Sequence, residues 1–549
     1  MSLRPWRVRT IAAGAAVVTA AGVLAACGGS SGSGSASSSS GSSGVLTVAT
    51  GATAYTDDFN LFSPNQQDAT NGMIYEPMFF YDTVKDGDVK PWLGTSYAWS
   101  NGGKTLTVQL KHNVKWTDGK PFTSADVVYT FDLAMKSTAL NKYALPLASV
   151  SADGTYGVTI NFTKPAYTDG YYALGRVEIL PQHIWKSISN PTTFLNEHPV
   201  GTGAYILTKF SPQVFELTAN PHYYMPGLPH FKTVRFIGYT GNATMDAAII
   251  AGQLDWTGAF IPNIKKTYLA KDPKFVVSDI PLATNFLVPN MATGPTTKLA
   301  VRQAISAALD RTGISNTVYN GYAPRSNPEA LITPNYSSVL DPSLASATFP
   351  SPNAAAAKSI LTKAGVATPL ALTVKMVAGY TDYLSSLQII QQELKPAGIN
   401  LVIDQEAYTA FTSDQDNGNF QLLIAGFGFT PDPWSYYYSL LDSSIAPAIG
   451  QADTVGNYGR YRNPQVDSLL SQIADTVNTS VQNPAFYKIE NIFAQQLPLI
   501  PLYEAQNEIE FNGHHVGNIP TVTNAYGAPA VYIQPDIGWI SARLVPVNK

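Results

Sequence analysis

The chain contains a single cysteine, Cys27, at the end of an apolar run close to its N-terminus. Arg4, Arg7 and Arg9 precede this run, and residues 11–23 are too short and too rich in alanine for a settled membrane span. A basic segment followed by a short apolar segment is typical of a secretory signal, so we expect the rest of the chain to lie outside the cell. No cysteine follows Cys27, and the fold must therefore be stable through burial alone, without disulfides.

The residues Leu24-Ala25-Ala26-Cys27 resemble the bacterial lipobox, in which a cysteine after small residues becomes the lipid-carrying N-terminus. The resemblance implies a lipoprotein signal peptide at residues 1–26 and acylation of Cys27. It places the protein at the cell membrane, on the extracytoplasmic side, in the periplasm or the cell-wall space. The alternative is an ordinary secretory signal with a stray cysteine. After Cys27 only Gly, Ser and Ala follow up to residue 44, so residues 27–44 are predicted to be a flexible linker.

Composition describes a large, well-packed globular body. The chain has 549 residues, of which 45 % are apolar and only 13 % are charged. Loss of residues 1–26 removes three arginines and no acids, which leaves 31 basic and 38 acidic residues and a net charge of −7. Such a balance argues against nucleic acid as a partner. No later stretch is long and apolar enough to span a bilayer.

The first half of the body reads as β-rich. Residues 45–49 predict a strand, and residues 71–80 look helical. Apolar and polar residues alternate over 106–110 and 158–162, which predicts antiparallel strands with one buried face. Asp118-Gly119 predicts a turn, and Thr123-x-x-Asp126 resembles a capping box at the start of a helix.

The second half reads as α/β. Apolar residues at i, i+3, i+4, i+7 and i+8 over 301–309 predict an amphipathic helix docked on a sheet. A similar stripe over 383–394 stops at Gly398 and is followed by alternation over 399–403, which predicts a helix-to-strand unit. Asn353 and Pro464 suit the first turns of two further helices.

Several blocks resemble the family 5 extracellular solute-binding proteins, the receptors that deliver oligopeptides, dipeptides or nickel to ABC importers. The match covers nearly all of residues 45–540. In chain order the blocks are Trp116 to Phe131, Val200-Gly201-Thr202-Gly203-Ala204-Tyr205, Asn220-Pro221 with Tyr223-Tyr224, Gly252-x-Leu254-Asp255, Val301-Arg302-Gln303-Ala304-Ile305 with Asp310-Arg311, Asn463-Pro464-x-Val466-Asp467, and Leu499-Ile500-Pro501-Leu502-Tyr503.

The resemblance implies an α/β protein with a two-lobed, periplasmic-binding-protein type II-like fold and an extra β-rich subdomain. We expect lobe I at residues 45–285 with the inserted subdomain at about 76–190, lobe II at residues 286–498, and a return to lobe I at residues 499–549. The resemblance also implies a monomeric substrate-binding protein that captures oligo- or dipeptides between the lobes and delivers them to the permease subunits. Oligosaccharides and metal chelates are the alternative cargoes.

The predicted ligand site centres on residues 425–436. In the resembling family this segment carries a glycine–aromatic pair that meets the ligand, then an aspartate that pairs with a peptide's ammonium, upstream of an Asp-Pro. Here the Asp-Pro is present at 432–433 but the earlier aspartate is absent, which leaves Asp432 as the candidate for that role. Glycines allow close backbone approach, and aromatic side chains offer large apolar faces, although each could equally be core. The predicted ligand-binding residues are Phe427, Gly428, Phe429, Asp432, Trp434 and Tyr436, with Tyr55 and Asn60 as weaker candidates from the first lobe.

Few residues are arranged as an enzyme requires. No H-E-x-x-H spacing occurs, and the adjacent pair His514-His515 is a poor chelate on an extended backbone. Asp57, Asp58 and Glu504 are available carboxylates for a glycosidase, but turn or capping roles explain the first two more simply. We therefore expect a binding protein with no catalytic residues, no cofactor and no metal ligands. A secreted hydrolase is the alternative of a different class.

Overall fold

The computed structural model describes residues 44–547 apart from 86, 279, 322, 332–335, 337–338, 345–347, 429, 431, 454 and 507–508. The predicted signal peptide, Cys27, the linker up to residue 43 and Phe429 lie outside the described residues. Among the residues that are described, no helix has both the length and the apolar character needed to cross a membrane.

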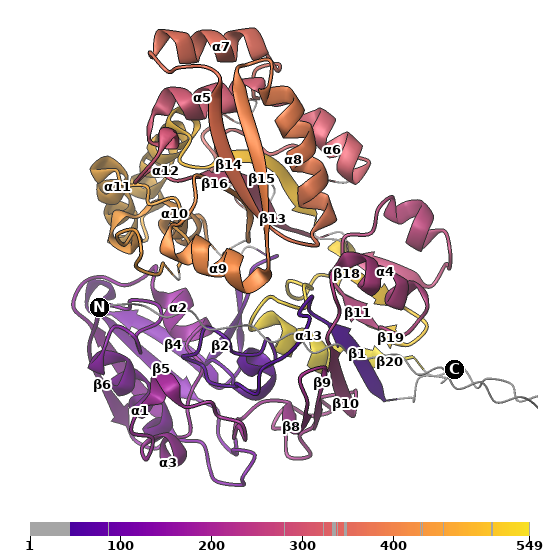
Figure 1. Ribbon diagram of the computed structural model, residues 1–549. Helices are drawn as coiled ribbons and strands as arrows, with labels where there is room; N and C mark the ends of the chain where they lie inside the picture. Colours follow the sequence, from indigo (N-terminus) through magenta and orange to yellow (C-terminus); the bar gives the residue numbers. More distant parts are fainter. Residues whose placement is uncertain are drawn as a thin grey trace, which may run out of the picture. The chain divides into compact units, whose positions relative to one another are not determined.

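A first sheet combines strands from both ends of the chain (Figure 1). The predicted strand at residues 45–49 is confirmed as β1, and it pairs in parallel with β10 and β11. Helix α4 (Asn242–Ile250) contacts β11 and β18. The sheet order is β12 (Phe275–Ser278), β18 (Ile509–Asn512), β11 (Trp256–Thr257), β1 (Val45–Ala49), β10 (Thr233–Ile237), β9 (Val214–Ala219) and β8 (Tyr205–Phe210).

A second sheet forms the core of the middle of the chain. Its order is β15 (Ile399–Glu406), β14 (Leu370–Val377), β16 (Leu422–Gly428), β13 (Pro281–Pro289) and β17 (Ile500–Gln506). β14 and β15 are parallel and α8 connects them, so the predicted helix-to-strand unit is confirmed. The apolar stripe predicted at 301–309 is buried in this core. The helices between residues 299 and 394 are α5 (Leu299–Ala308), α6 (Arg311–Tyr319), α7 (Ala354–Lys363) and α8 (Thr381–Leu394).

A smaller antiparallel sheet lies within residues 94–162 and is followed by short helices. We call the β2–β3 hairpin, this sheet and helices α1 to α3 the β-rich subdomain. The predicted alternation is confirmed, since β5 pairs with β7 and the apolar side chains of both strands are buried. The elements are β2 (Phe79–Asp82), β3 (Asp88–Pro91), β4 (Gly94–Ser100), β5 (Thr105–Leu110), α1 (Ser124–Lys136), β6 (Leu147–Asp153), β7 (Gly157–Phe162), α2 (Gly170–Gly175) and α3 (Gln182–Trp185).

The remaining elements complete the two ends of the body. The later helices are α9 (Tyr408–Asn417), α10 (Pro433–Leu441), α11 (Pro464–Ala474), α12 (Thr479–Gln496) and α13 (Asp536–Arg543), with strands β19 (Val516–Gly517) and β20 (Val545–Pro546). Short turns of 3₁₀ or π type are η1 (Thr70–Ile74), η2 (Asn101–Gly103), η3 (Pro191–Thr193), η4 (Lys265–Leu269), η5 (Pro295–Thr297), η6 (Ser443–Ile445) and η7 (Val522–Asn524).

Two antiparallel strand pairs carry the chain between the first and second sheets. β12 pairs with β18 in the first sheet, and β13 pairs with β17 in the second. The chain therefore changes sheet between residues 278 and 281 and again between 506 and 509. The expected boundaries at 285/286 and 498/499 differ from these points, because β13 and β17 belong to the second sheet over their whole lengths. The predicted domains, two lobes with a subdomain inserted in the first, stay a prediction.

Local turn and cap chemistry follows the sequence closely. Gly119 has φ of +88°, as the predicted Asp-Gly turn requires. The predicted capping box is present, with the Thr123 backbone N–H donating to the Asp126 carboxylate at 3.0 Å. Asn353 accepts from the backbone N–H of Ala356, and Pro464 occupies the first turn of α11.

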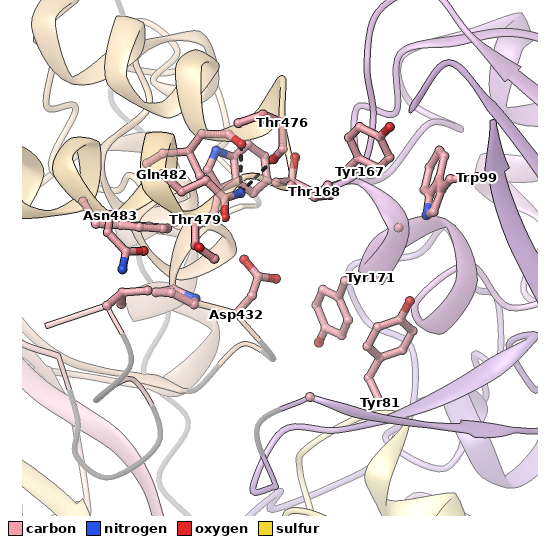
Figure 2. Close-up of a pocket in the computed structure, with 18 of the residues that line it drawn as sticks. Tyr81, Trp99, Tyr167, Thr168, Tyr171, Asp432, Thr476, Thr479, Gln482 and Asn483 are labelled. Atoms are coloured by element: carbon pink, nitrogen blue, oxygen red, sulfur yellow. Dashed lines mark hydrogen bonds between the residues drawn. The ribbon is translucent and has the colours of Figure 1, made fainter. Parts of the chain in front are cut away.

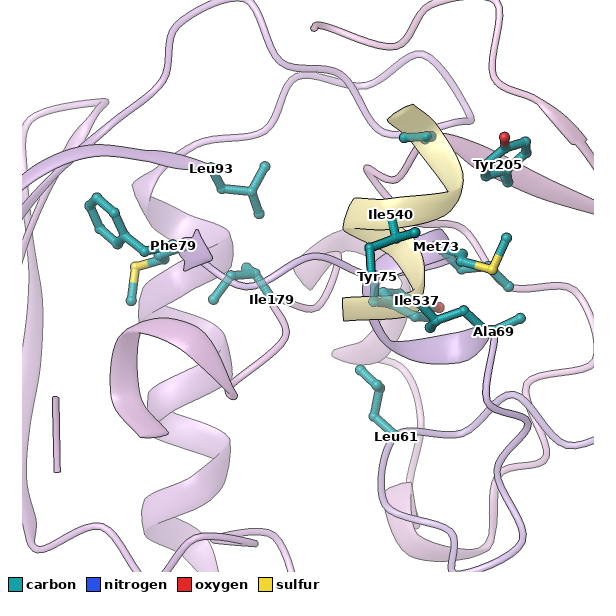
Figure 3. Close-up of a cluster of buried hydrophobic side chains, with 14 of the residues drawn as sticks. Leu61, Ala69, Met73, Tyr75, Phe79, Leu93, Ile179, Tyr205, Ile537 and Ile540 are labelled. Atoms are coloured by element: carbon teal, nitrogen blue, oxygen red, sulfur yellow. The ribbon is translucent and has the colours of Figure 1, made fainter. Parts of the chain in front are cut away.

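The helix expected at residues 71–80 is wrong. Only the short π turn η1 forms, and residues 79–82 are strand β2. Gly72 has φ of +87°, which interrupts the helix, and α13 packs directly on this turn. Figure 3 shows the yellow α13, with Ile537 and Ile540, lying across the segment that carries Met73 and Tyr75. A tertiary contact between backbones therefore overrides the local helical pattern.

A buried carboxylate, Glu76, explains why two of the sequence blocks occur together. Trp92 Nε1 donates to it at 2.6 Å, and the hydroxyls of Thr202, Tyr223 and Tyr224 donate at 2.7 to 2.9 Å. Burial raises the pKa of Glu76 to about 7, and the four donors oppose a larger rise because they favour the ionised form. Thr202 and the two tyrosines belong to the V-G-T-G and N-P-x-Y-Y blocks, so these blocks connect the β-rich subdomain to the first sheet.

We expect the free energy of unfolding to fall as the pH rises from 5.5 to 8. Burial raises the pKa of both Glu76 and Asp536 to about 7, so the folded state binds protons that the unfolded state releases near pH 4. Their stabilising contribution is complete below about pH 4 and is lost as the pH passes through 7. Urea unfolding at the two pH values should differ by about 2–4 kcal/mol.

Asp536→Asn is the matched control for this pH dependence. Asp536 Oδ1 accepts from the backbone N–H of Ala528 at 2.7 Å, a bond that an asparagine oxygen can keep while the titrating group is lost. The difference in the free energy of unfolding between pH 5.5 and pH 8 should therefore be smaller in the variant. Equal or greater stability of the unmodified protein at pH 8 would contradict the prediction.

Candidate functional site

A cavity of about 620 Å³ lies between the β-rich subdomain and the helices α10 to α12 (Figure 2). Among the described residues that line it, seven are aromatic and one, Asp432, is charged. The lining residues are Tyr81, Gly87, Tyr97, Trp99, Tyr167, Thr168, Gly170, Tyr171, Val339, Asp432, Pro433, Trp434, Ile473, Thr476, Val477, Thr479, Gln482, Asn483 and Phe486.

One wall is a group of rings from the β-rich subdomain. Tyr97 and Trp99 are two residues apart on β4, so their side chains lie on the same face of the strand. Trp99 packs on Tyr167 with ring centroids 5.5 Å apart, and Tyr81 packs edge-on against Tyr171 at 5.4 Å. A Cβ atom on Gly170 would lie 3.3 Å from the Trp99 ring, so the start of α2 and this ring are closely packed.

The opposite wall begins at Asp432, where α10 starts. One carboxylate oxygen of Asp432 accepts from the Ser435 backbone N–H at 2.8 Å, and the other accepts from the Ser435 hydroxyl at 2.8 Å. Asp432 is thus the N-cap of α10, and Pro433 fits the first helical position. Trp434 donates through Nε1 to the Leu470 carbonyl at 2.8 Å, which fixes its ring between α10 and α11.

The electrostatics of the cavity are acidic. Burial raises the pKa of Asp432, and burial raises that of the nearby Asp169 to about 6, with Lys164 opposing the second shift. The charges of the two carboxylates also repel one another. The part of the lining that the structure describes contains no lysine, arginine or histidine. The walls therefore offer ring faces, hydroxyls, amides and negative charge.

Two of the predicted site residues, Asp432 and Trp434, line this cavity. Three others from the same segment do not. Tyr436 is buried and donates its hydroxyl to the Ala330 carbonyl at 3.1 Å. Phe427 packs against Phe286 and Tyr458 at 5.7 and 5.8 Å, and Gly428 pairs with Ala283 between β16 and β13. A role in ligand contact stays a prediction for all of them.

The first-lobe candidates also lie elsewhere. Tyr55 packs edge-on against Phe215 with centroids 4.8 Å apart. Asn60 donates to the Pro191 carbonyl at 2.8 Å and accepts from the Phe62 backbone N–H at 3.0 Å. Both residues therefore hold loops of the first half in place, and neither is among the residues lining the cavity.

Sequence reasoning missed the ring wall of the β-rich subdomain. Two signals point to it in retrospect. Tyr97 and Trp99 alternate on one face of an antiparallel strand, and tyrosines flank Gly170 in a stretch rich in turn residues. Neither signal says that these rings meet Asp432, because more than 260 positions separate the two segments in sequence.

The polar groups considered for enzyme chemistry do not converge. His514 and His515 pair with different carboxylates, Asp272 at 2.8 Å and Asp255 at 2.9 Å. Asp58 accepts from the Asn60 backbone N–H at 3.1 Å within its own loop. Burial raises the pKa of Glu504 on β17 to about 7, but Glu504 does not line the cavity. Within the described part of the chain, no cluster of three or more His, Cys, Asp or Glu side chains is placed to hold a metal ion.

Comparison with known proteins adds family-level information. The sequence profile described as bacterial extracellular solute-binding proteins, family 5 Middle, matches residues 88–447. The periplasmic murein peptide-binding protein MppA of Escherichia coli is 23 % identical over 456 residues, which cover 77 % of this chain and 80 % of the relative. The nickel-binding periplasmic protein of E. coli is 24 % identical over 501 residues, which cover 87 % and 92 %.

A solved structure is similar over almost its whole length. It is the mannohexaose-bound periplasmic oligopeptide-binding protein of an oligopeptide ABC transporter from Thermotoga maritima. The TM-score is 0.85 at 23 % identity, with 92 % of this chain and 99 % of the other covered. The similarity establishes the fold of the present chain.

Proposed function

We propose a function from one premise: this chain belongs to the bacterial extracellular solute-binding proteins of family 5. The resemblance seen in the sequence blocks and the expected α/β fold of periplasmic-binding-protein type are thereby confirmed. The protein is the extracytoplasmic substrate-binding component of an ABC importer for peptides, nickel or a similar solute, in a family made up of binding proteins rather than enzymes.

The proposed cargo is a short peptide. The observation that carries the proposal is the 620 Å³ cavity, whose two walls come from separate parts of the chain. Its volume lies within the range of small-ligand sites, and it combines ring faces with hydroxyl and amide groups. Such a surface suits side chains of varied shape, while main-chain groups of a peptide supply hydrogen bonds. The names of MppA and the T. maritima protein are in keeping with this cargo.

Capture is proposed to involve closure of the two lobes about the paired strands. β12–β18 and β13–β17 are the strand pairs on either side of the points where the chain changes sheet. Few residues need to change their backbone angles at such a connection, and hinge closure around ligands is the usual motion of periplasmic binding proteins.

Lipid at Cys27 and the Gly/Ser linker are proposed to keep the protein beside the permease that receives the cargo. The support is the lipobox-like sequence and the composition of residues 27–44. An aqueous partition of the mature protein in a detergent phase split, or a free thiol at Cys27, would contradict the anchor.

Oligosaccharide is the second candidate, because tyrosine and tryptophan rings on one wall can stack on sugar faces. The structurally similar T. maritima protein was crystallised with mannohexaose. A secreted hydrolase has no comparable support here.

Titration calorimetry with tri-alanine, mannohexaose and a nickel–histidine complex tests the proposal. We expect the peptide to bind and to raise the melting temperature, since a ligand at 100 times its Kd stabilises by about 2.7 kcal/mol. Tyr97→Ala should weaken that binding, because Tyr97 lines the cavity and is 36 % exposed. Tyr408→Ala is the matched control, since Tyr408 is 61 % exposed and lies outside the cavity. Binding of mannohexaose alone, or equal affinity of the two variants, would overturn peptide capture in this cavity.

A further inference from the structure

The cavity pairs a ring-rich wall with the Asp432 carboxylate, which caps α10 and has no cationic partner among the described residues. In Figure 2 the carboxylate of Asp432 extends into the open space toward Tyr171 and Tyr81, with Trp99 and Tyr167 on the same far wall. The Asp432 oxygens accept hydrogen bonds from the Ser435 backbone N–H, the Ser435 hydroxyl and the Trp434 backbone, and none of these donors is a cationic side chain.

Two cations of this region, Arg176 and Lys164, are not among the described residues that line the cavity. Arg176 lies over the Tyr171 ring at 5.9 Å and donates to the Tyr171 hydroxyl at 3.3 Å, but it does not line the cavity. Lys164 acts on Asp169, which precedes α2 and carries a second negative charge close to Asp432. The described lining of the cavity therefore holds rings and negative charge, and neither of these two cations belongs to it.

Rings and a carboxylate around one space are the chemistry that recognises an organic cation. The π face of Tyr or Trp attracts ammonium and guanidinium groups, most strongly where water is excluded. A carboxylate adds a charge-assisted hydrogen bond. An anion would meet repulsion here, and a neutral sugar would stack on the rings but leave the carboxylates without a counter-charge.

We propose that the cavity selects ligands that carry a side-chain cation, an ammonium or guanidinium held between the Asp432 carboxylate and the rings of Tyr81, Tyr171 and Trp99. The inference rests on the proposed capture of peptides, and it narrows the cargo to basic peptides. The net charge of −7 predicted for the mature chain favours the same ligands at long range.

The variant Asp432→Asn removes the negative charge of the side chain but can keep its structural role as a helix cap. Asparagine is as good an N-cap as aspartate, so its oxygen can keep the bond from the Ser435 backbone N–H while the charge is lost. Asp442→Asn is the matched control, because Asp442 caps η6 through the Ser444 backbone N–H at 2.8 Å and lies outside the cavity. Both variants should fold like the unmodified protein, which their melting temperatures check.

The test uses three tripeptides that differ only in the middle residue: Ala-Lys-Ala, Ala-Gln-Ala and Ala-Glu-Ala. We expect calorimetry to give the tightest binding for Ala-Lys-Ala. Asp432→Asn should lower the affinity for Ala-Lys-Ala by about tenfold or more and should change the affinity for Ala-Gln-Ala little. Asp442→Asn should change neither. The preference for lysine should also decrease with added salt.

The outcomes distinguish this inference from the function on which it rests. If the three peptides bind equally well, peptide capture stands and the cation preference is wrong. If Asp432→Asn weakens all three alike, the carboxylate binds their shared N-terminal ammonium, and the side-chain assignment is overturned. If none of the peptides binds, both the proposed function and this inference fail.

Discussion

Replacement of Gly201 by alanine is expected to cost more than about 4 kcal/mol of stability, enough to prevent accumulation of folded protein. A Cβ atom at this position would lie 1.8 Å from the Ile74 carbonyl oxygen and 2.6 Å from its carbon. Both contacts are to backbone, which cannot move without displacing η1 and the α13 helix packed on it. The measurement is the soluble yield, followed by urea unfolding of any folded fraction.

Gly365→Ala is the control that measures the cost of a left-handed backbone conformation without a steric clash. Gly365 has φ of +65° and open space around its Cβ position, whereas Gly201 is not in the left-handed region. The Gly365 variant should lose only about 1 kcal/mol, the usual cost of a left-handed non-glycine residue. Similar losses in both variants would show that close packing against Ile74 is not what requires glycine at position 201.

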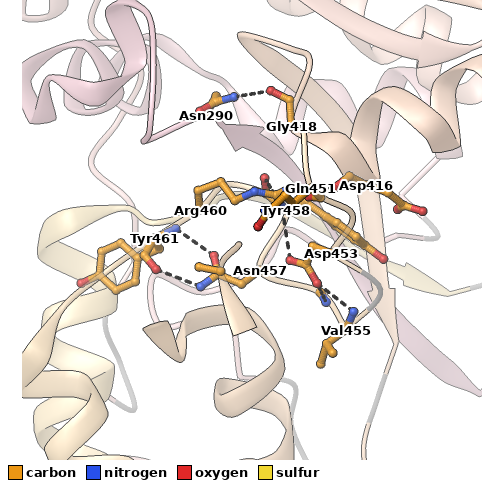
Figure 4. A network of polar contacts seen from close by, with 12 residues as sticks. Asn290, Asp416, Gly418, Gln451, Asp453, Val455, Asn457, Tyr458, Arg460 and Tyr461 are labelled. Carbon is orange, nitrogen blue, oxygen red and sulfur yellow. Dashed lines mark hydrogen bonds and ion pairs between the residues drawn. The ribbon is translucent and has the colours of Figure 1, made fainter. Parts of the chain in front are cut away.

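Replacement of Arg460 by methionine is expected to lower the free energy of unfolding by about 3–5 kcal/mol. The side chains of Arg460 and Asp453 are 1 % and 0 % exposed, and their charged atoms are 3.4 Å apart. Figure 4 shows Arg460, in the loop that precedes α11, among the polar groups of Asp453, Gln451 and Tyr458. Its guanidinium also donates to the carbonyls of Asp416, Gln451 and Tyr458. Methionine would leave the Asp453 carboxylate and these carbonyls without their cationic partner.

Two further variants test the explanation by urea unfolding. Arg462→Met removes a neighbouring, exposed arginine and should cost at most about 1 kcal/mol. The double variant Asp453→Leu with Arg460→Met removes both charges and should recover part of the loss, because no unpaired charge is then buried. A loss below 1 kcal/mol for Arg460→Met, or no recovery in the double variant, would contradict a structural role for the buried pair.

Two residues of the predicted ligand-binding segment, Asp432 and Trp434, line the observed cavity. Local sequence explains why these two could be predicted. Asp432-Pro433 is an N-cap followed by a first-turn proline, a pattern that can be read from sequence alone. Trp434 follows within the same helical turn, so its position is set by the cap. Phe427 and Tyr436 show the opposite case, because burial of an aromatic side chain depends on neighbours that the segment itself does not contain.

The amino-acid sequence by itself determined the family and several local features: the strands at 45–49 and 106–110, the capping box at Thr123, and the helix-to-strand unit ending at residue 403. The local features depend on residues that are close together in sequence. Only the tertiary structure decided that Gly72 breaks an expected helix, that the strand pairs β12–β18 and β13–β17 belong to different sheets, and that the rings of β4 face Asp432. Each of these results from contacts between segments hundreds of residues apart, and periodicity along the chain carries no information about which distant segment supplies the other wall.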